Sequence, residues 1–225
     1  MKKYAVIVAG GSGQRMGTSL PKQFLLLQGK PLLWYSLQVF LQAFDDLQII
    51  LVVPGDNLLE GERLAKELDG GTRIRVVTGG NTRFHSVQNG LASVTSPSIV
   101  FVHDGVRCLV GADLIRRCYT QALEKGSAIP AVAATDSIRV VEGAGHLVMD
   151  RNRVRIIQTP QTFQSELLLP AFQRDYTDSF TDEATVVEAW GKEVFLIEGE
   201  YTNIKITRPV DLLVAERILA DRSSL

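Results

Sequence analysis

YAVIVAGGSGQRMGTSLPKQ, residues 4–23, joins a short apolar run to a loop rich in glycine. The run at 4–9 is rich in β-branched residues, which predicts a strand buried on both faces. Four glycines follow it, at Gly10, Gly11, Gly13 and Gly17. Glycine lets backbone N–H groups approach a ligand closely, and α/β proteins hold phosphates where a strand leads into such a loop. We therefore expect an anion-binding loop after the first strand.

Two cations, Arg15 and Lys22, distinguish this loop from better-known phosphate loops. A Walker A loop needs Gly-Lys followed by Ser or Thr, which is absent. A dinucleotide loop needs G-x-G-x-x-G and an acidic residue after the second strand, but here the spacing is longer and the strand runs into Pro54. A nicotinamide dehydrogenase is therefore disfavoured. Two cations beside a nest of N–H groups suit a nucleoside triphosphate, and the alternative is a solvated basic loop.

Composition narrows the class of protein further. A chain of 225 residues suits one α/β domain, and we expect a single domain over 1–225. A net charge of −1 gives no reason to expect nucleic acid or an anionic membrane as a partner. Cys108 and Cys118 form neither a disulfide framework nor a metal quartet. Without a predicted signal peptide or a run of membrane-spanning length, we expect a cytoplasmic protein.

Predicted strands and helices alternate through the first 133 residues. After the first strand, we expect strands at 47–53, 73–78, 99–103 and 128–133, and helices at 32–41, 57–68, 84–94 and 112–123. This alternation predicts the α/β class, with a mostly parallel, doubly wound sheet. Further on, we expect helices beginning at Ser165, after Glu183 and at Pro209, a strand at 193–197, and an extended piece at 203–207.

The segment at about 136–157 interrupts the alternation. Residues 137–141 and 146–149 read as a hairpin, joined by Glu142-Gly143-Ala144-Gly145, where a crossover helix would be expected. An inserted β-arm on a small domain often packs on a second subunit, so we expect a protruding arm that makes a homodimer. The alternative is a surface hairpin without a partner.

Candidate site residues follow the strands at the sheet edge where open parallel sheets bind ligands. Asp104 ends the fourth strand, where it can hold Mg²⁺, although an aspartate there can also cap a helix or a turn. Arg107 can grip a second phosphate with its planar fork, or lie on the surface.

Gly79 and Gly80 allow a flat ring to approach the backbone. Asn81 and Ser86 can pair with a base edge, and Lys205 lies beyond the last strand.

Taken together, these motifs resemble one family, the 2-C-methyl-D-erythritol 4-phosphate cytidylyltransferases of the non-mevalonate isoprenoid pathway. The matching pieces span nearly the whole chain: 9–16, 21–23, 79–80 with Arg83, 86–87, 102–104 with Arg107, 150–152, 159–161, 181–183 and 203–209. Ribitol 5-phosphate cytidylyltransferases share most of them and are the alternative for the acceptor. A non-catalytic nucleotide-binding module is the alternative from another class. Such a module would lose the cations or Asp104, which this chain keeps.

The resemblance implies a Rossmann-like nucleotidyltransferase sheet, a β-arm that interlocks two subunits, and a role for each matching residue. Arg15, Lys22, Asp104 and Lys205 are implied to be catalytic, with Asp104 holding Mg²⁺. The implied CTP-binding residues are Ala9, Gly10, Gly11, Gly13, Gly79, Gly80, Asn81 and Ser86. The implied phosphosugar-binding residues are Arg107, Ser137, Arg151 and Thr159, with Arg151 reaching over from the partner's arm.

The chain departs from the usual family pattern on the acceptor side. Gly105, Val106 and Cys108 stand where alanines and a proline are usual around the arginine, and Ser137 stands where threonine is common. The charges are retained, so the expected difference is one of local shape.

Overall fold

The computed structural model of the chain describes residues 1–10 and 21–223. Its main strands are β1 (Lys2–Val8), β4 (Leu47–Val53), β5 (Ile74–Thr78), β6 (Ser98–Asp104), β7 (Ser127–Ala133), β10 (Arg155–Ile157), β11 (Gln161–Gln164) and β12 (Leu196–Glu198). Its helices are α1 (Leu32–Ala43), α2 (Leu58–Asp69), α3 (Arg83–Leu91), α4 (Ala112–Lys125), α5 (Ser165–Ala171), α6 (Glu183–Ala189) and α7 (Pro209–Ser223). Short β2 (Leu26–Leu27) and β3 (Lys30–Pro31) pair with each other.

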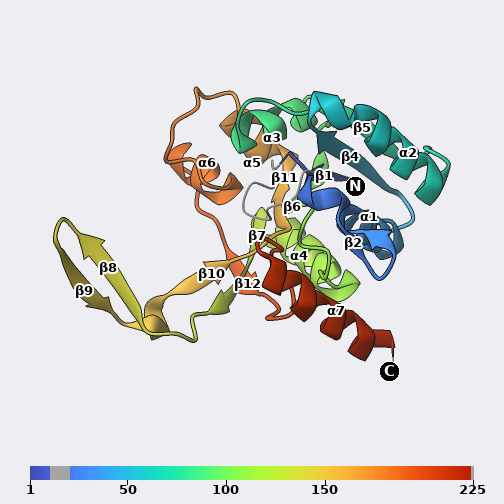
Figure 1. The fold of residues 1–225 in the computed structure, drawn as a ribbon. Coiled ribbons are helices and arrows are strands. Elements are labelled where there is room, and N and C mark those ends of the chain that lie inside the picture. Colours follow the sequence, from blue (N-terminus) through green and yellow to red (C-terminus); the bar gives the residue numbers. More distant parts are fainter. Residues whose placement is uncertain (11–20, 224–225) are drawn as a thin grey trace.

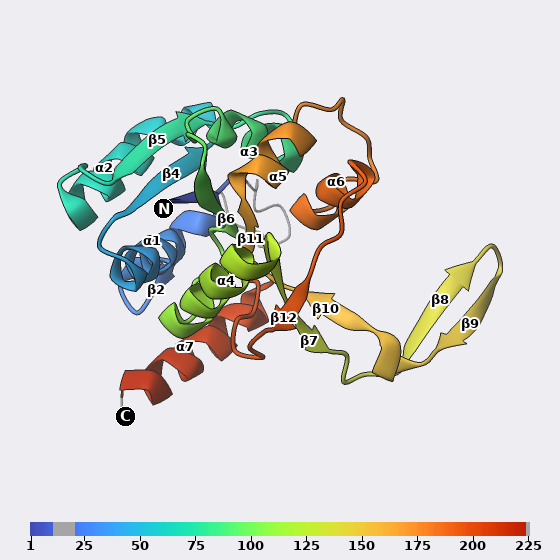
Figure 2. The same ribbon diagram turned by 180° about the vertical axis from the view of Figure 1, so that it is seen from behind.

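The central sheet is mostly parallel, as the alternation predicts. β6, β1, β4 and β5 lie side by side as parallel neighbours. Helices α1, α2 and α4 pack on one face of this sheet, while α3, α5 and α6 pack on the other (Figures 1 and 2). The carboxyl ends of the parallel strands therefore meet along one edge, which is where α/β sheets bind ligands.

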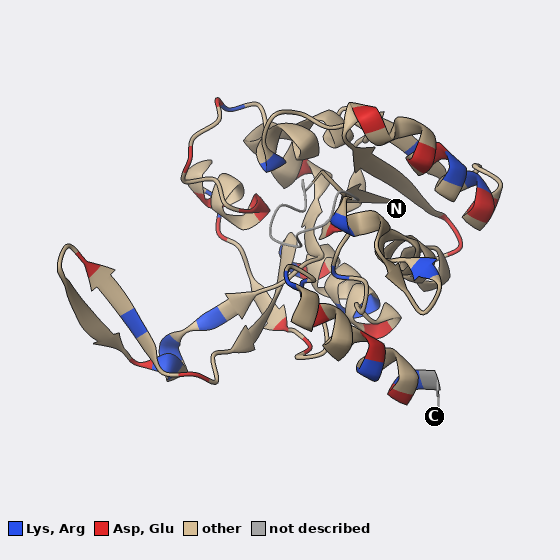
Figure 3. Ribbon diagram, viewed as in Figure 1, with Lys and Arg blue, Asp and Glu red and all other residues tan. Residues whose placement is uncertain are grey.

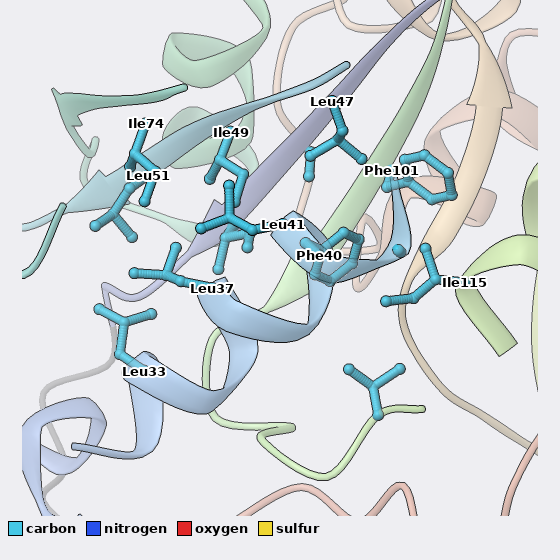
Figure 4. Close-up of a cluster of buried hydrophobic side chains, with 14 of the residues drawn as sticks. Leu33, Leu37, Phe40, Leu41, Leu47, Ile49, Leu51, Ile74, Phe101 and Ile115 are labelled. Carbon is cyan, nitrogen blue, oxygen red and sulfur yellow. The ribbon is translucent and has the colours of Figure 1, made fainter. Parts of the chain in front are cut away.

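Alternation along β1 divides the buried side chains between two cores. Ala5 and Ile7 face the first core, whereas Val6 and Val8 face the second. In the first core, Leu37, Phe40 and Leu41 of α1 lie against Ile49 and Leu51 of β4 (Figure 4). Because both faces are covered, β1 is buried on both sides, as its apolar run predicts.

The end of the sheet beside β6 differs from the prediction. β11 inserts between β6 and β7 and runs antiparallel to both, where the sequence predicts only a returning connection. Four residues with little alternation carry almost no strand signal, and the pairing comes from two neighbours that are distant in sequence. β10 was likewise not predicted, and β12 begins three residues later than expected.

The predicted hairpin exists and leaves the body of the molecule. β8 (Ile138–Glu142) and β9 (Gly145–Met149) form a separate two-stranded sheet that projects outward (Figures 1 and 2). We call residues 136–157 the arm. Along its strands Val141 is 76% exposed and Val148 is 73% exposed. No helix in the described part of the chain is long and apolar enough to cross a membrane.

Candidate active site

Backbone hydrogen bonds tie the strand ends together at the candidate site. The N–H of Ala9 donates to the carbonyl of Val52, and the N–H of Gly79 donates to that of Val53. On the other side, the N–H of Gly105 donates to the carbonyl of Val8. The segments that follow β1, β5 and β6 are therefore held as one rigid rim.

A cavity of about 240 Å³ opens at this rim. The described residues that line it are Val8, Ala9, Gly10, Lys22, Gln23, Gly80, Asn81, Thr82, Arg83, Ser86, Asp104, Val106 and Lys205. We call it the first cavity. Gly10 and Gly80 lie beside Ser86 in what we call the polar end, and Arg83 and Lys205 pair with Asp104. This combination suits a ligand with a flat base and a phosphate chain.

Ser86 shapes the polar end of the first cavity. Its Oγ accepts a hydrogen bond from the N–H of Gly80 at 3.1 Å and lies 3.3 Å from the Gly80 carbonyl. A Cβ on Gly80 would lie 2.4 Å from the Cβ of His85 and 3.0 Å from its backbone carbon, so only glycine fits there. Thr82 caps α3 by accepting from the N–H of His85. The loop before α3 is thus held close to the helix and open toward the cavity.

A second cavity of about 190 Å³ adjoins the first. The described residues that line it are Arg83, Asp104, Arg107, Ile157, Gln158, Thr159, Gln161, Thr181, Asp182 and Lys205. Three residues, Arg83, Asp104 and Lys205, line both cavities and form a shared wall. Two ligands in these cavities would meet at this wall.

Three cations surround the carboxylate of Asp104. Lys205 Nζ lies 2.9 Å from Oδ2, Arg83 Nε lies 3.2 Å from Oδ1, and Arg107 Nε lies 3.7 Å from Oδ2. Burial alone would raise the pKa of Asp104, but the charges of Arg83 and Lys205 outweigh burial and hold it well below its usual range. The carboxylate is therefore ionised at neutral pH.

Thr159 and His103 form a hydrogen-bond chain to the backbone of Asp104. The N–H of Asp104 donates to Thr159 Oγ1 at 3.0 Å, and Oγ1 lies 3.0 Å from His103 Nδ1. His103 Nε2 lies 3.3 Å from the carbonyl of Arg107, which can only accept, so Nε2 carries the proton and Nδ1 accepts from Thr159. Burial lowers the pKa of His103 to about 3 and keeps the ring neutral. His103 is thus a structural histidine.

Arg107 lies at the floor of the second cavity. Its Nη groups donate to the carbonyls of Asn203 and Ile157, while Nε makes no hydrogen bond with the described residues. Burial lowers the pKa of Arg107, and the neighbouring Asp104 carboxylate opposes that effect. The guanidinium keeps its charge, because arginine is not deprotonated in proteins.

The three departures from the family pattern around Arg107 lie in different environments. A Cβ on Gly105 would lie 2.9 Å from Leu33 Cδ1 and 3.3 Å from the Cβ of Ala9, so an alanine there would require Leu33 to move. Val106 lines the first cavity. Cys108 is buried beside Leu109 in a core under α7 and acts as a packing residue, and burial raises its pKa to about 12.

The structure gathers most of the predicted site residues. Ala9, Gly10, Lys22, Gly80, Asn81, Ser86, Asp104 and Lys205 line the first cavity, and Arg107 and Thr159 line the second. Gly79 lies directly behind Ser86, since a Cβ there would be 2.9 Å from Ser86 Oγ. Ser137 and Arg151 are exposed on the arm and line neither cavity. Gly11, Gly13 and Arg15 lie outside the described residues.

Arg83 and Glu183 belong to the site but had no role in the sequence-based prediction. Arg83 binds Asp104 with Nε and both oxygens of Glu183 with its two Nη groups. Arg83 stands in a recognised motif piece, so its position near the predicted base loop was the available signal. Glu183 also stands in a matching piece, 181–183, but its place in the first turn of a helix predicts a solvated residue rather than a partner of Arg83.

Comparison with known proteins gives a consistent answer. The sequence model of the 2-C-methyl-D-erythritol 4-phosphate cytidylyltransferases matches residues 4–221. Proteins of that name from Bacteroides thetaiotaomicron and Porphyromonas gingivalis are each 46% identical over 219 residues, which cover 97% of this chain and 100% and 98% of those proteins.

Solved structures agree with the sequence relatives. The 4-diphosphocytidyl-2C-methyl-D-erythritol synthase of Anaerococcus prevotii superposes with a TM-score of 0.83 at 27% identity, covering 97% of this chain and 98% of that one. The 2-C-methyl-D-erythritol 4-phosphate cytidylyltransferase of Thermus thermophilus gives 0.73 at 30% identity, covering 96% and 98%. This chain belongs to the 2-C-methyl-D-erythritol 4-phosphate cytidylyltransferase family.

Proposed function

We propose that the chain transfers CMP from CTP to 2-C-methyl-D-erythritol 4-phosphate, releasing pyrophosphate and forming 4-diphosphocytidyl-2-C-methyl-D-erythritol in the non-mevalonate isoprenoid pathway. The observation that carries this proposal is the wall shared by the two cavities, where Asp104 and Lys205 face both. A transferase for two phosphorylated substrates needs such a junction, because the attacking oxygen must approach the α-phosphorus in line with the leaving group.

The chemistry fits the groups at this junction. A phosphate monoester has a second pKa near 6, so the acceptor is mostly a dianion at neutral pH and can attack the α-phosphorus of CTP directly. One bond forms from the acceptor oxygen to that phosphorus, and the bond to the pyrophosphate oxygen breaks. No general base is needed. His103 is not free to act as one, because it is buried and both of its ring nitrogens are hydrogen-bonded.

The protein must then supply positive charge. The described lining residues of the two cavities include four cations, Lys22, Arg83, Arg107 and Lys205, against two carboxylates, Asp104 and Asp182. We propose that Lys22 and Arg15 stabilise charge on the reacting phosphates and that Lys205 binds the nucleotide phosphate. Arg107 would bind the acceptor. Fixed cations of this kind stabilise a transition state without having to reorganise.

The first cavity is proposed to hold the nucleotide with its base at the polar end. Ser86 and Gly80 are hydrogen-bonded to each other, so the loop is already shaped before a ligand arrives. Backbone groups of Ala9, Gly10 and Gly80, with the side chain of Asn81, line the rest of that end. Gly11, Gly13 and Gly79 remain proposed members of the same subsite.

Asp104 suits a Mg²⁺ that arrives with the nucleotide. No cluster of three or more His, Cys, Asp or Glu side chains that could hold a metal occurs among the described residues. A single carboxylate beside phosphate oxygens fits Mg²⁺, which is usually held by one or two carboxylates together with substrate phosphates. When bound there, Mg²⁺ supplies further positive charge to the phosphate oxygens.

The arm is proposed to complete the phosphosugar site of a second copy in a homodimer. A two-stranded hairpin is at best marginally stable alone, and Val141 and Val148 leave its apolar surface open to solvent. Basic residues gather at the base of the arm, where Arg151 and Arg155 lie (Figure 3). Arg151 and Ser137 would then reach the partner's acceptor phosphate, which explains why they line neither cavity of their own chain.

Pyrophosphate release tests the proposed reaction. The assay compares CTP with 2-C-methyl-D-erythritol 4-phosphate against CTP with ribitol 5-phosphate, each with and without Mg²⁺. We expect turnover only with the methylerythritol substrate and the metal. Preference for ribitol 5-phosphate would refute the acceptor, and no turnover with either would refute the reaction. We expect the enzyme to act in the cytoplasm, where thiols such as Cys108 and Cys118 stay reduced.

A further inference from the structure

Glu183 is a fully buried carboxylate that the proposed chemistry does not use. It begins α6, directly after the N-cap Asp182, and its side chain is 0% exposed. Both of its oxygens accept from the guanidinium of Arg83, which begins α3. The bidentate pair therefore joins two helices that are 100 residues apart in the sequence.

Arg83 also binds Asp104, so it links Glu183 to the carboxylate at the junction of the two cavities. Its Nε donates to Oδ1 of Asp104 at 3.2 Å, so the guanidinium lies between two carboxylates. Burial would lower the pKa of Arg83, but the charges of Glu183 and Asp104 outweigh burial and raise it, so this cation is permanent. Among the three cations around Asp104, Arg83 is the one that the described structure ties to a second carboxylate.

A gain in folding stability alone does not explain the Arg83–Glu183 pair. Taking an arginine and a glutamate out of water is expensive, and well-packed apolar side chains of similar size often stabilise a protein as well or better. The pair also lies where precise placement matters, because Arg83 and Asp104 both line the two cavities.

We propose that Glu183 is a positioning residue, which fixes Arg83 so that Arg83 fixes the carboxylate of Asp104 at the junction of the two substrate cavities. This inference rests on the proposed cytidylyl transfer and assigns new roles to Arg83 and Glu183 within it. Asp104 is then held from two sides, by Thr159 at its backbone and by Arg83 at Oδ1. Its other oxygen, Oδ2, faces Lys205, the most exposed of the three cations.

A double replacement separates positioning from folding. Arg83→Met alone leaves the buried Glu183 carboxylate without its partner and is expected to destabilise the fold, whereas Glu183→Met alone leaves Arg83 bonded to Asp104 only. The double variant Arg83→Met with Glu183→Met removes both charges while keeping an unbranched side chain at each position. We expect it to melt close to the parent protein, yet to lose about 100-fold in kcat, the scale of a small misplacement at a reaction centre.

Two further measurements complete the test. Val187→Ala, a buried position on the same helix, is the control for a purely structural change, and its kcat should stay at the parent value. CTP binding is measured with and without Mg²⁺, and the gain in affinity from Mg²⁺ should shrink in the double variant because Asp104 is no longer held.

The outcomes are distinct. The inference would be overturned if the folded double variant had the same kcat as the parent protein and the same increase in CTP affinity on adding Mg²⁺. The proposed function would then remain intact. If the parent protein binds no CTP, the proposed function fails, and the inference that rests on it fails too. The positioning role is supported if the double variant binds CTP without Mg²⁺ as tightly as the parent, shows a smaller increase in CTP affinity on adding Mg²⁺, and has a lower kcat.

Discussion

Replacing Thr159 by valine removes one hydroxyl and leaves the branched shape of the side chain almost unchanged. That hydroxyl is used twice inside the protein, since it accepts from the N–H of Asp104 and donates to Nδ1 of His103. All three residues are buried, at 4%, 6% and 0% exposure. In Thr159→Val both partners lose their hydrogen bond with little access to water.

The expected loss follows from these two orphaned groups. Each buried polar group left without a partner costs about 1–3 kcal/mol, so the two together should lower the unfolding free energy by about 2–6 kcal/mol. For a chain of this size, 1 kcal/mol corresponds to about 2–4 °C, which puts the expected fall in Tm at roughly 4–24 °C. Because the N–H of Asp104 is one of the orphaned groups, kcat should fall as well.

Thermal and urea unfolding of the parent, Thr159→Val and Thr159→Ser measure this loss. The serine variant keeps the hydroxyl and should lie near the parent, since it removes only a methyl group. Steady-state kinetics then tests the predicted contact of Thr159 with the phosphosugar, because loss of such a contact would raise KM for that substrate. A Tm for Thr159→Val within a degree or two of the parent would refute the hydrogen-bond chain.

Four further predictions address the rest of the site. Lys22→Ala should lower kcat by about 10²–10³, and an intact kcat with only a raised KM for CTP would mean that Lys22 merely holds the nucleotide. Ser86→Ala removes the hydrogen bond to Gly80, so KM for CTP should rise about three- to tenfold in initial-rate measurements; an unchanged KM would argue against a preformed loop. His103 has a pKa of about 3 in the fold against about 6.5 when unfolded, so the unfolded chain binds the extra proton between these values and stability rises with pH across that window. From pH 7 to pH 5 this group should remove about 2 kcal/mol in urea unfolding, a slope absent from His103→Gln, and equal slopes would contradict the buried neutral ring. Finally, mixing Arg151→Ala subunits with Lys22→Ala subunits should restore part of the turnover if each site borrows the partner's arm, whereas no recovery at any mixing ratio would favour self-contained sites.

Local features could be predicted because neighbouring residues determine them. The buried strand at the start of the chain follows from its apolar run, and the phosphate-type loop follows from the glycines after it. The arm could be recognised because residues 137–141 and 146–149, joined by Glu142-Gly143-Ala144-Gly145, read as a hairpin where a crossover helix would be expected. The place of Asp104 and Lys205 beside the two cavities could be predicted because Asp104 ends a strand and Lys205 lies beyond one, at the edge where open parallel sheets bind ligands.

Other features depend on how distant elements pack. The four residues of β11 become a strand only because β6 and β7 offer edges on both sides. The resemblance implies that Thr159 binds the phosphosugar, and only the fold shows that its hydroxyl also lies between Asp104 and a buried histidine. Glu183 stands in a matching motif piece, but only the docking of α6 against α3 shows that it is buried on Arg83.

The sequence by itself thus determined the class of fold, the sheet edge at which the two cavities open and the family, since these depend on short-range patterns and motif order. Only the tertiary structure decided which hydroxyls and charges hold Asp104 in place. The physical reason is that a buried side chain must find its partner wherever packing puts one, and the pairing of Arg83 with Glu183 spans 100 residues of chain that no local pattern can bridge.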